Sequence, residues 1–285
     1  MPFAVSIAVL GLVQAALVAL PVPRPLPAWL ERLRGRWWAL APALSIVVVV
    51  GGIELYSDSA TALAYLALVA VPPLAAYAFA DLVRVRENPS STKVFADSPP
   101  AGYGGMASAL VSGALFALAW FSAGSLVGEA AALALSALAC VTLGWLLTCA
   151  VSARWLRWGI YAMAALDAVL VAADLLQGPS DVLSVAAPAA DLPALQVANF
   201  GAARMGFGDL FVAALVGCLL VKPADGPGSG HIDTFAARRQ LYAAGLVAAL
   251  ALAFDLLFFA VDTLPATVPV AVALAIVSRR SSAQL

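Results

Sequence analysis

Residues 205–222 decide the fold, and they read MGFGDLFVAALVGCLLVK. After Asp209 the chain carries no charge until Lys222, a run too apolar for the surface of a soluble protein. An ionisable side chain at membrane depth costs several kcal/mol unless it is paired, neutralised or hydrated, so it is a functional candidate by default. The stretch therefore predicts a membrane helix that carries a functional acid.

The whole chain has the same apolar character. Of its 285 residues 64% are apolar and 11% are charged, against about 45–50% and about 25% in an average soluble domain. A soluble globular protein is therefore excluded, and the lipid bilayer becomes the expected surroundings. The formal net charge of -1 argues against a nucleic-acid partner. One histidine and three scattered cysteines favour neither a metal site nor disulfides, and no cofactor is expected.

Nine apolar segments approach the length of about 20 residues that a helix needs to cross a bilayer. They run approximately over 4–22, 38–55, 60–82, 106–127, 129–152, 159–176, 194–221, 240–260 and 262–278. The loops between them are short, so no separate soluble domain is expected. The predicted fold is all-α, a single membrane domain over residues 1–285 built as a bundle of nine transmembrane helices.

The basic residues test this division independently of hydropathy. All but one of the 15 lie after odd-numbered segments: Arg24, Arg32, Arg34, Arg36, Arg84, Arg86, Lys93, Arg154, Arg157, Lys222, Arg238, Arg239, Arg279 and Arg280. The exception, Arg204, lies inside the seventh segment. By the positive-inside rule the amino terminus is expected outside and the carboxyl terminus in the cytoplasm.

Among the ionisable side chains of the apolar segments, five are expected in the bilayer core: Asp167, Asp174, Arg204, Asp209 and Asp255. Asp167 and Asp174 are seven residues apart, which puts both on one face of a helix. Asp209 follows Gly206, Phe207 and Gly208, and the two glycines are expected to let a neighbouring backbone approach and to loosen the helix near the acid.

The ninth segment opens with Leu264, Pro265, Ala266 and Thr267, and Pro269 follows. Two prolines four residues apart remove backbone donors and leave carbonyls unpaired where the helix enters the membrane. Lipid does not tolerate such backbone unless it lines a protein cavity. An irregular segment facing the interior of the bundle is therefore expected.

These features together resemble the presenilin and signal peptide peptidase family of intramembrane aspartyl proteases. The likeness covers mainly the chain from Tyr161 onward and rests on an Asp in the sixth segment, Gly-x-Gly-Asp in the seventh and Pro-Ala opening the ninth. It implies a divergent, prokaryotic-type member in the plasma membrane, with Asp167 and Asp209 as the catalytic pair. It also implies that the segment from Leu264 to Thr267 binds substrate.

Two positions depart from the family pattern. Leu166 stands where the family has Tyr before the first acid, and Thr267 stands where the family has the Leu of Pro-Ala-Leu. Depth in the membrane does not distinguish Asp167 from Asp174, and only the resemblance favours Asp167. Asp174, Asp255 and Arg204 are secondary candidates. Asp255 is expected to line a cavity or to be hydrogen-bonded. Arg204 is expected to extend its charged end out of the apolar layer or to alter the pKa of Asp209.

The function implied is hydrolysis of peptide bonds within transmembrane helices whose amino termini lie in the cytoplasm, including leftover signal peptides. Two alternatives remain open. A prepilin-type peptidase also uses Gly-x-Gly-Asp, although that family has Val-Lys after the acid where this chain has Leu210 and Phe211. A proton- or ion-coupled transporter would use the buried acids, Arg204 and Asn199 as a relay.

Overall fold

The computed structural model describes residues 1–22, 58–87, 103–173, 188, 192–222, 234–256 and 265–282. This part of the chain contains eight helices and one β-hairpin. The helices are α1 (Phe3–Ala19), α4 (Asp58–Glu87), α5 (Tyr103–Phe121), α6 (Leu126–Ala150), α7 (Ala153–Ala172), α9 (Phe207–Val221), α10 (Thr234–Asp255) and α11 (Thr267–Ser282). The predicted segment 38–55 lies outside the described residues.

Within the described residues, three stretches are long and apolar enough to cross a membrane: Thr61–Val83 within α4, and the helices α6 and α7. Helices α1, α5 and α9 are also apolar but shorter. The predicted mainly helical fold is thus confirmed, with candidate membrane spans among its helices, whereas the count of nine spans stays a prediction.

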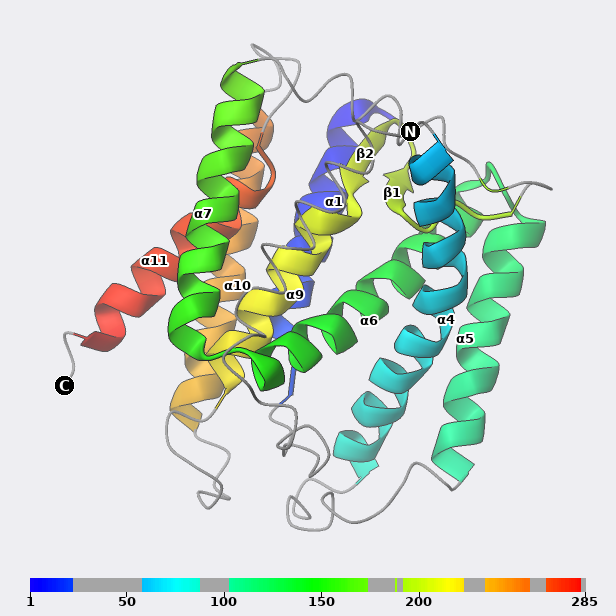
Figure 1. Cartoon of the computed structure of the whole chain (residues 1–285), viewed down its shortest axis with the longest axis horizontal. Helices are drawn as coiled ribbons and strands as arrows, with labels where there is room; N and C mark the ends of the chain where they lie inside the picture. Colours follow the sequence, from blue (N-terminus) through cyan, green and yellow to red (C-terminus); the bar gives the residue numbers. More distant parts are fainter. Residues whose placement is uncertain are drawn as a thin grey trace.

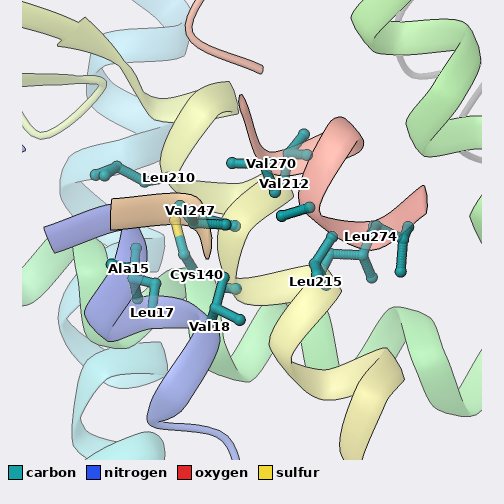
Figure 2. Close-up of a cluster of buried hydrophobic side chains, with 14 of the residues drawn as sticks. Ala15, Leu17, Val18, Cys140, Leu210, Val212, Leu215, Val247, Val270 and Leu274 are labelled. Carbon is teal, nitrogen blue, oxygen red and sulfur yellow. The ribbon is translucent and has the colours of Figure 1, made fainter. Parts of the chain in front are cut away.

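Helix α9 lies at the centre of the larger core. Its residues from Val212 to Val221 are all buried, as expected for a helix that is apolar on every side. Figure 2 shows its Val212 and Leu215 among side chains of α1, α10 and α11, such as Val18, Val247 and Leu274. Gly217 lets α1 come close, since an added Cβ would lie 2.6 Å from the carbonyl oxygen of Val18.

Helices α4, α5 and α6 form a second group that joins the first through the contact of α6 with α9. Helix α4 continues through Pro72 and Pro73. Neighbouring helices donate hydroxyl groups to carbonyls of this region: Ser112 of α5 binds Pro72 at 2.7 Å and Thr142 of α6 binds Leu74 at 2.8 Å. These bonds join α4 to α5 and α6 beside the prolines, whereas the carbonyls that lose their helical donors to Pro72 and Pro73 are those of Leu68 and Val69.

The helices run alternately up and down. The ends of α4, α6 and α9 and the starts of α5, α7 and α10 lie at one end of the bundle, and the hairpin lies at the other (Figure 1). Basic residues of the described chain follow this pattern, with Arg154 and Arg157 starting α7, Lys222 closing α9, and Arg238 and Arg239 in the first turns of α10.

The predicted helix over 194–221 is wrong in its first half. Strand β1 (Val197–Phe200) pairs antiparallel with β2 (Ala203–Gly206), and α9 begins only at Phe207. Gly201 opens the two-residue turn with a φ of +59°, a conformation that glycine adopts without a steric cost. Apolar composition alone could not reveal this, because a buried strand and a buried helix share it.

Candidate functional site

Asp167 lies near the end of α7 and is bound by the start of α11. Its Oδ2 accepts two hydrogen bonds from Thr267, one from the backbone N–H at 3.3 Å and one from the hydroxyl Oγ1 at 2.5 Å. Thr267 is the first residue of α11 and is buried. The first four N–H groups of a helix have no partner within the helix, so the Asp167 carboxylate satisfies one of them from another helix.

Asp209 lies in the first turn of α9 and is partly buried. Its Oδ2 accepts a hydrogen bond of 3.2 Å from the backbone N–H of Gly206, which caps the helix. This is the acidic half of a capping box, and the other half is missing because Gly206 has no side chain. Phe207 lies between the two glycines. It packs against the larger core around α9 and against the buried cluster of α4 and α6, and so anchors this turn.

The fold brings the two acids together. Helices α7 and α9 contact each other, and both contact α11. The carboxyl groups of Asp167 and Asp209 lie within range of direct charge repulsion. The amino-terminal ends of α9 and α11 carry partial positive charge toward the two carboxyl groups, which favours negative charge at this place.

The two prolines predict unpaired carbonyls where α11 opens, but the carbonyls of Pro265 and Ala266 are both hydrogen-bonded. Pro265 and Ala266 precede the helix, and the carbonyl of Pro265 accepts a hydrogen bond of 3.2 Å from Val268. Pro269 falls in the first turn of α11, where a proline removes no helical hydrogen bond. The carbonyl of Ala266 is bound by Gln14 of α1 at 3.3 Å. Leu264 lies outside the described residues.

The expected role of the glycines in helix packing is not what the structure shows. An added Cβ at Gly208 would meet nothing within 4 Å, and at Gly206 it would meet the carboxylate of Asp209 itself at 3.2 Å. Gly206 therefore makes room for the acid rather than for a neighbouring backbone. The glycines that allow close packing of α9 are Gly217 against α1 and Gly144 of α6 against Ala214 and Leu215.

The secondary candidates are not gathered at the pair. Arg204 is exposed on β2, not inside a helix, and borders an open cavity of about 190 Å³ together with Glu129 and Asn199. Asp255 ends α10 close to Gly11 of α1. Its buried Oδ2 accepts no hydrogen bond from the described residues. Asp174 lies outside the described part of the chain.

Sequence reasoning missed the uncharged polar residues of α1 and α6. Gln14 binds the carbonyl of Ala266, and the Ser6 hydroxyl oxygen accepts the N–H of Ala202 in the hairpin turn. Ser136 of α6 donates to the carbonyl of Leu195 just before β1. The sequence feature that could have indicated Gln14 is a glutamine within an otherwise apolar segment, because a buried amide group needs a hydrogen-bond partner.

Comparisons with models of protein families, with curated proteins and with solved structures find no match. The resemblance to the presenilin and signal peptide peptidase family stays a prediction.

Proposed function

We propose that this protein is an intramembrane aspartyl protease that hydrolyses peptide bonds within transmembrane helices. The observation that supports this most is the meeting of Asp167 and Asp209. The two acids come from different helices, lie close enough to repel each other and are each held at the amino-terminal end of a helix. A single buried acid could serve structure alone, whereas a pair sharing one proton is the minimal acid and base of an aspartyl protease.

The chemistry needs only the two carboxyl groups and water. The ionised carboxylate takes a proton from a water molecule, whose oxygen attacks the peptide carbonyl, while the protonated carboxyl donates a hydrogen bond to the carbonyl oxygen. The carbon–nitrogen bond then breaks as the nitrogen receives a proton, leaving a new carboxyl end and a new amino end. No group of the enzyme forms a covalent bond with the substrate.

A substrate helix has all its backbone groups paired and has to unwind before attack. The segment from Pro265 to Thr267 is adjacent to Asp167 and is the proposed place of contact for the unwound chain. Its Ala266 carbonyl and Thr267 N–H are already bonded to Gln14 and Asp167. A substrate that pairs here as an added strand therefore uses other backbone groups or displaces these two bonds.

The preferred substrates are helices whose amino termini lie in the cytoplasm. The basic residues at the start of α7, the end of α9 and the start of α10 lie at one end of the bundle (Figure 1), and the positive-inside rule assigns this end to the cytoplasm. The amino terminus of the enzyme is then outside and the carboxyl terminus inside. Because the acids and the adjoining segment have a fixed arrangement, the direction of the bound peptide follows from the orientation of the enzyme.

The test is a cleavage assay in reconstituted vesicles. Two single-span substrates carry the same apolar core in opposite, verified orientations, and the products are identified by mass spectrometry. We expect cuts within the core of the substrate whose amino terminus is on the cytoplasmic side, and none with the double variant Asp167→Asn/Asp209→Asn. Equal products from the double variant would refute the aspartyl mechanism, whereas cleavage of the opposite substrate would refute only the direction.

A further inference from the structure

Helix α1 carries two polar side chains on the face that packs into the bundle. Ser6 has an exposed fraction of 0% and Gln14 of 2%. They are eight residues apart, slightly more than two turns, and so lie on nearly the same face of the helix. The chain near them is apolar, and a buried amide or hydroxyl group is costly unless it is hydrogen-bonded. Both residues form hydrogen bonds with segments that lead into the candidate site.

Ser6 and Gln14 reach different parts of that site. The hydroxyl oxygen of Ser6 accepts the N–H of Ala202 at 3.2 Å, in the turn of the hairpin that leads into Asp209. The amide nitrogen of Gln14 donates to the carbonyl of Ala266 at 3.3 Å, directly before Thr267. Helix α1 therefore contacts two segments. One precedes α9, which carries Asp209, and the other precedes α11, whose first residue binds Asp167.

The bond from Gln14 acts on one particular peptide unit. The carbonyl of Ala266 and the N–H of Thr267 belong to the same planar, trans peptide group. Gln14 holds its oxygen, and the carboxylate of Asp167 holds its hydrogen. The two ends of a trans peptide unit point in opposite directions, so this plane is held from both sides. Rotation of the plane away from Gln14 also turns the N–H away from Asp167.

From this geometry we infer that Gln14 is a positioning residue for the acid pair. Through the Ala266–Thr267 peptide unit it fixes where Thr267 meets Asp167, and it does so without touching either acid. The inference rests on the proposed protease function for its kinetic consequence, but the control of the peptide unit is a property of the folded chain alone.

Gln240 offers a matched control. It is also a buried glutamine that supports α1, since its amide nitrogen donates to the carbonyls of Val18 at 2.9 Å and Pro21 at 2.8 Å. These bonds lie at the carboxyl end of α1, beginning about one turn beyond Gln14, and neither of them involves Ala266. Gln240→Met removes at least as many hydrogen bonds as Gln14→Met, so a general loss of stability affects both variants, whereas a positioning effect belongs to Gln14 alone.

The first measurement requires no substrate. Ala266→Cys is introduced as a reporter, and its reaction with a water-soluble thiol reagent is followed in detergent, where Cys140, Cys149 and Cys218 are buried and give little background. We expect Gln14→Met to raise the labelling rate at position 266 several-fold and Gln240→Met to leave it unchanged. Gln14→Leu provides a second variant if Gln14→Met does not accumulate.

The second measurement is the cleavage rate in the chain without the reporter. We expect Gln14→Met to lower kcat by about 10- to 100-fold, the effect of a displacement near 1 Å at an active site, with little change in KM. Gln240→Met should leave both constants near those of the natural sequence.

The inference would be overturned if Gln14→Met changed the labelling rate at position 266 and kcat no more than Gln240→Met does. A labelling difference together with no cleavage by any form of the protein would instead uphold the role of Gln14 on the peptide unit and refute the protease.

Discussion

Asp167 and Asp209 are held in different ways although they form one site. Asp167 receives two donors from Thr267 on another helix, and Asp209 receives one backbone donor from its own helix cap. The position of Asp167 thus depends on tertiary packing, whereas that of Asp209 is a local property of the Gly206–Asp209 turn. Under the proposed mechanism, a substitution at either acid removes half of a unit that acts jointly.

Replacement of either acid by its amide should abolish cleavage. Asp167→Asn and Asp209→Asn each leave one carboxyl group, which cannot serve as acid and base together, so the double variant should lose no more than either single one. The measurement is cleavage of a reconstituted substrate, with folding checked by circular dichroism. Asp174→Asn is the control and should stay active. An inactive Asp174→Asn beside an active Asp167→Asn would show that the first acid was assigned wrongly.

Thr267 should contribute through its hydroxyl group as well as its backbone. Thr267→Val keeps the shape of the side chain but removes the donor to Asp167, and hydrogen bonds to charged groups contribute about 1.5–3 kcal/mol. We expect kcat/KM to fall roughly tenfold or more. Thr267→Ser retains the hydroxyl and should retain most of the activity. Equal rates for the valine and serine variants would mean that the hydroxyl has no part in the reaction.

Among the elements, α9 combines a tightly packed body with an open first turn. Around Gly217 the carbonyls of Leu17 and Val18 lie within 2.8 Å of the place where a Cβ would be, whereas the place beside Gly208 is empty to 4 Å. The first glycine allows helices to pack, and the second leaves space next to Asp209. Substitutions at these two positions should therefore affect different properties: stability at Gly217 and activity at Gly208.

Gly217→Ala should destabilise the protein by about 1–3 kcal/mol, the usual cost of overpacking a core. Gly208→Ala should leave stability unchanged or raise it by up to about 1 kcal/mol, because alanine favours the helix. It should nevertheless slow cleavage, since a methyl group then occupies the space beside the acid. Thermal unfolding in detergent and the cleavage assay measure the two effects. A larger loss of stability for Gly208→Ala than for Gly217→Ala would contradict this reading of α9.

For the whole molecule, the two ends of the bundle differ in charge and in structure. One end contains the basic residues at the helix ends, and the other contains the β-hairpin (Figure 1). The helical rise of about 1.5 Å per residue puts Asp167 roughly 15 Å from Arg157 and Asp209 roughly 20 Å from Lys222. The two acids are therefore at comparable distances from the basic end, and the proposed orientation puts them inside an apolar layer about 30 Å thick.

Accessibility labelling in intact cells tests the orientation. Ala202→Cys reports on the hairpin turn, where the residue is exposed, and Ser229→Cys reports on the loop between Lys222 and Arg239. We expect a membrane-impermeant reagent to label position 202 from outside and position 229 only after the cells are opened. The natural chain, whose three cysteines are buried, is the background control. Labelling of position 229 alone from outside would reverse the orientation.

Much of the architecture was readable from the residues, because membrane helices are specified by local composition. A long run of apolar residues between charged ends favours a helix in lipid, because a helix pairs its own backbone groups. For this reason the predicted segments 60–82, 129–152 and 159–176 coincide within a few residues at most ends with helices α4, α6 and α7. The charged candidates inside the apolar segments were equally visible, since their cost in lipid depends on their chemical type.

Contacts between distant residues could not be read in this way. Thr267 is 100 residues from Asp167 and Gln14 is 252 residues from Ala266, and only the packing of α1, α7, α9 and α11 brings them together. The hairpin before α9 likewise depends on acceptors supplied by Ser6 and Glu129, which bind the N–H groups of Ala202 and Gly201. Hydropathy and residue type are properties of each segment by itself, so the sequence determined the helices and their acids. Hydrogen-bond partners are properties of neighbours in space, so the tertiary structure alone decided the pairing.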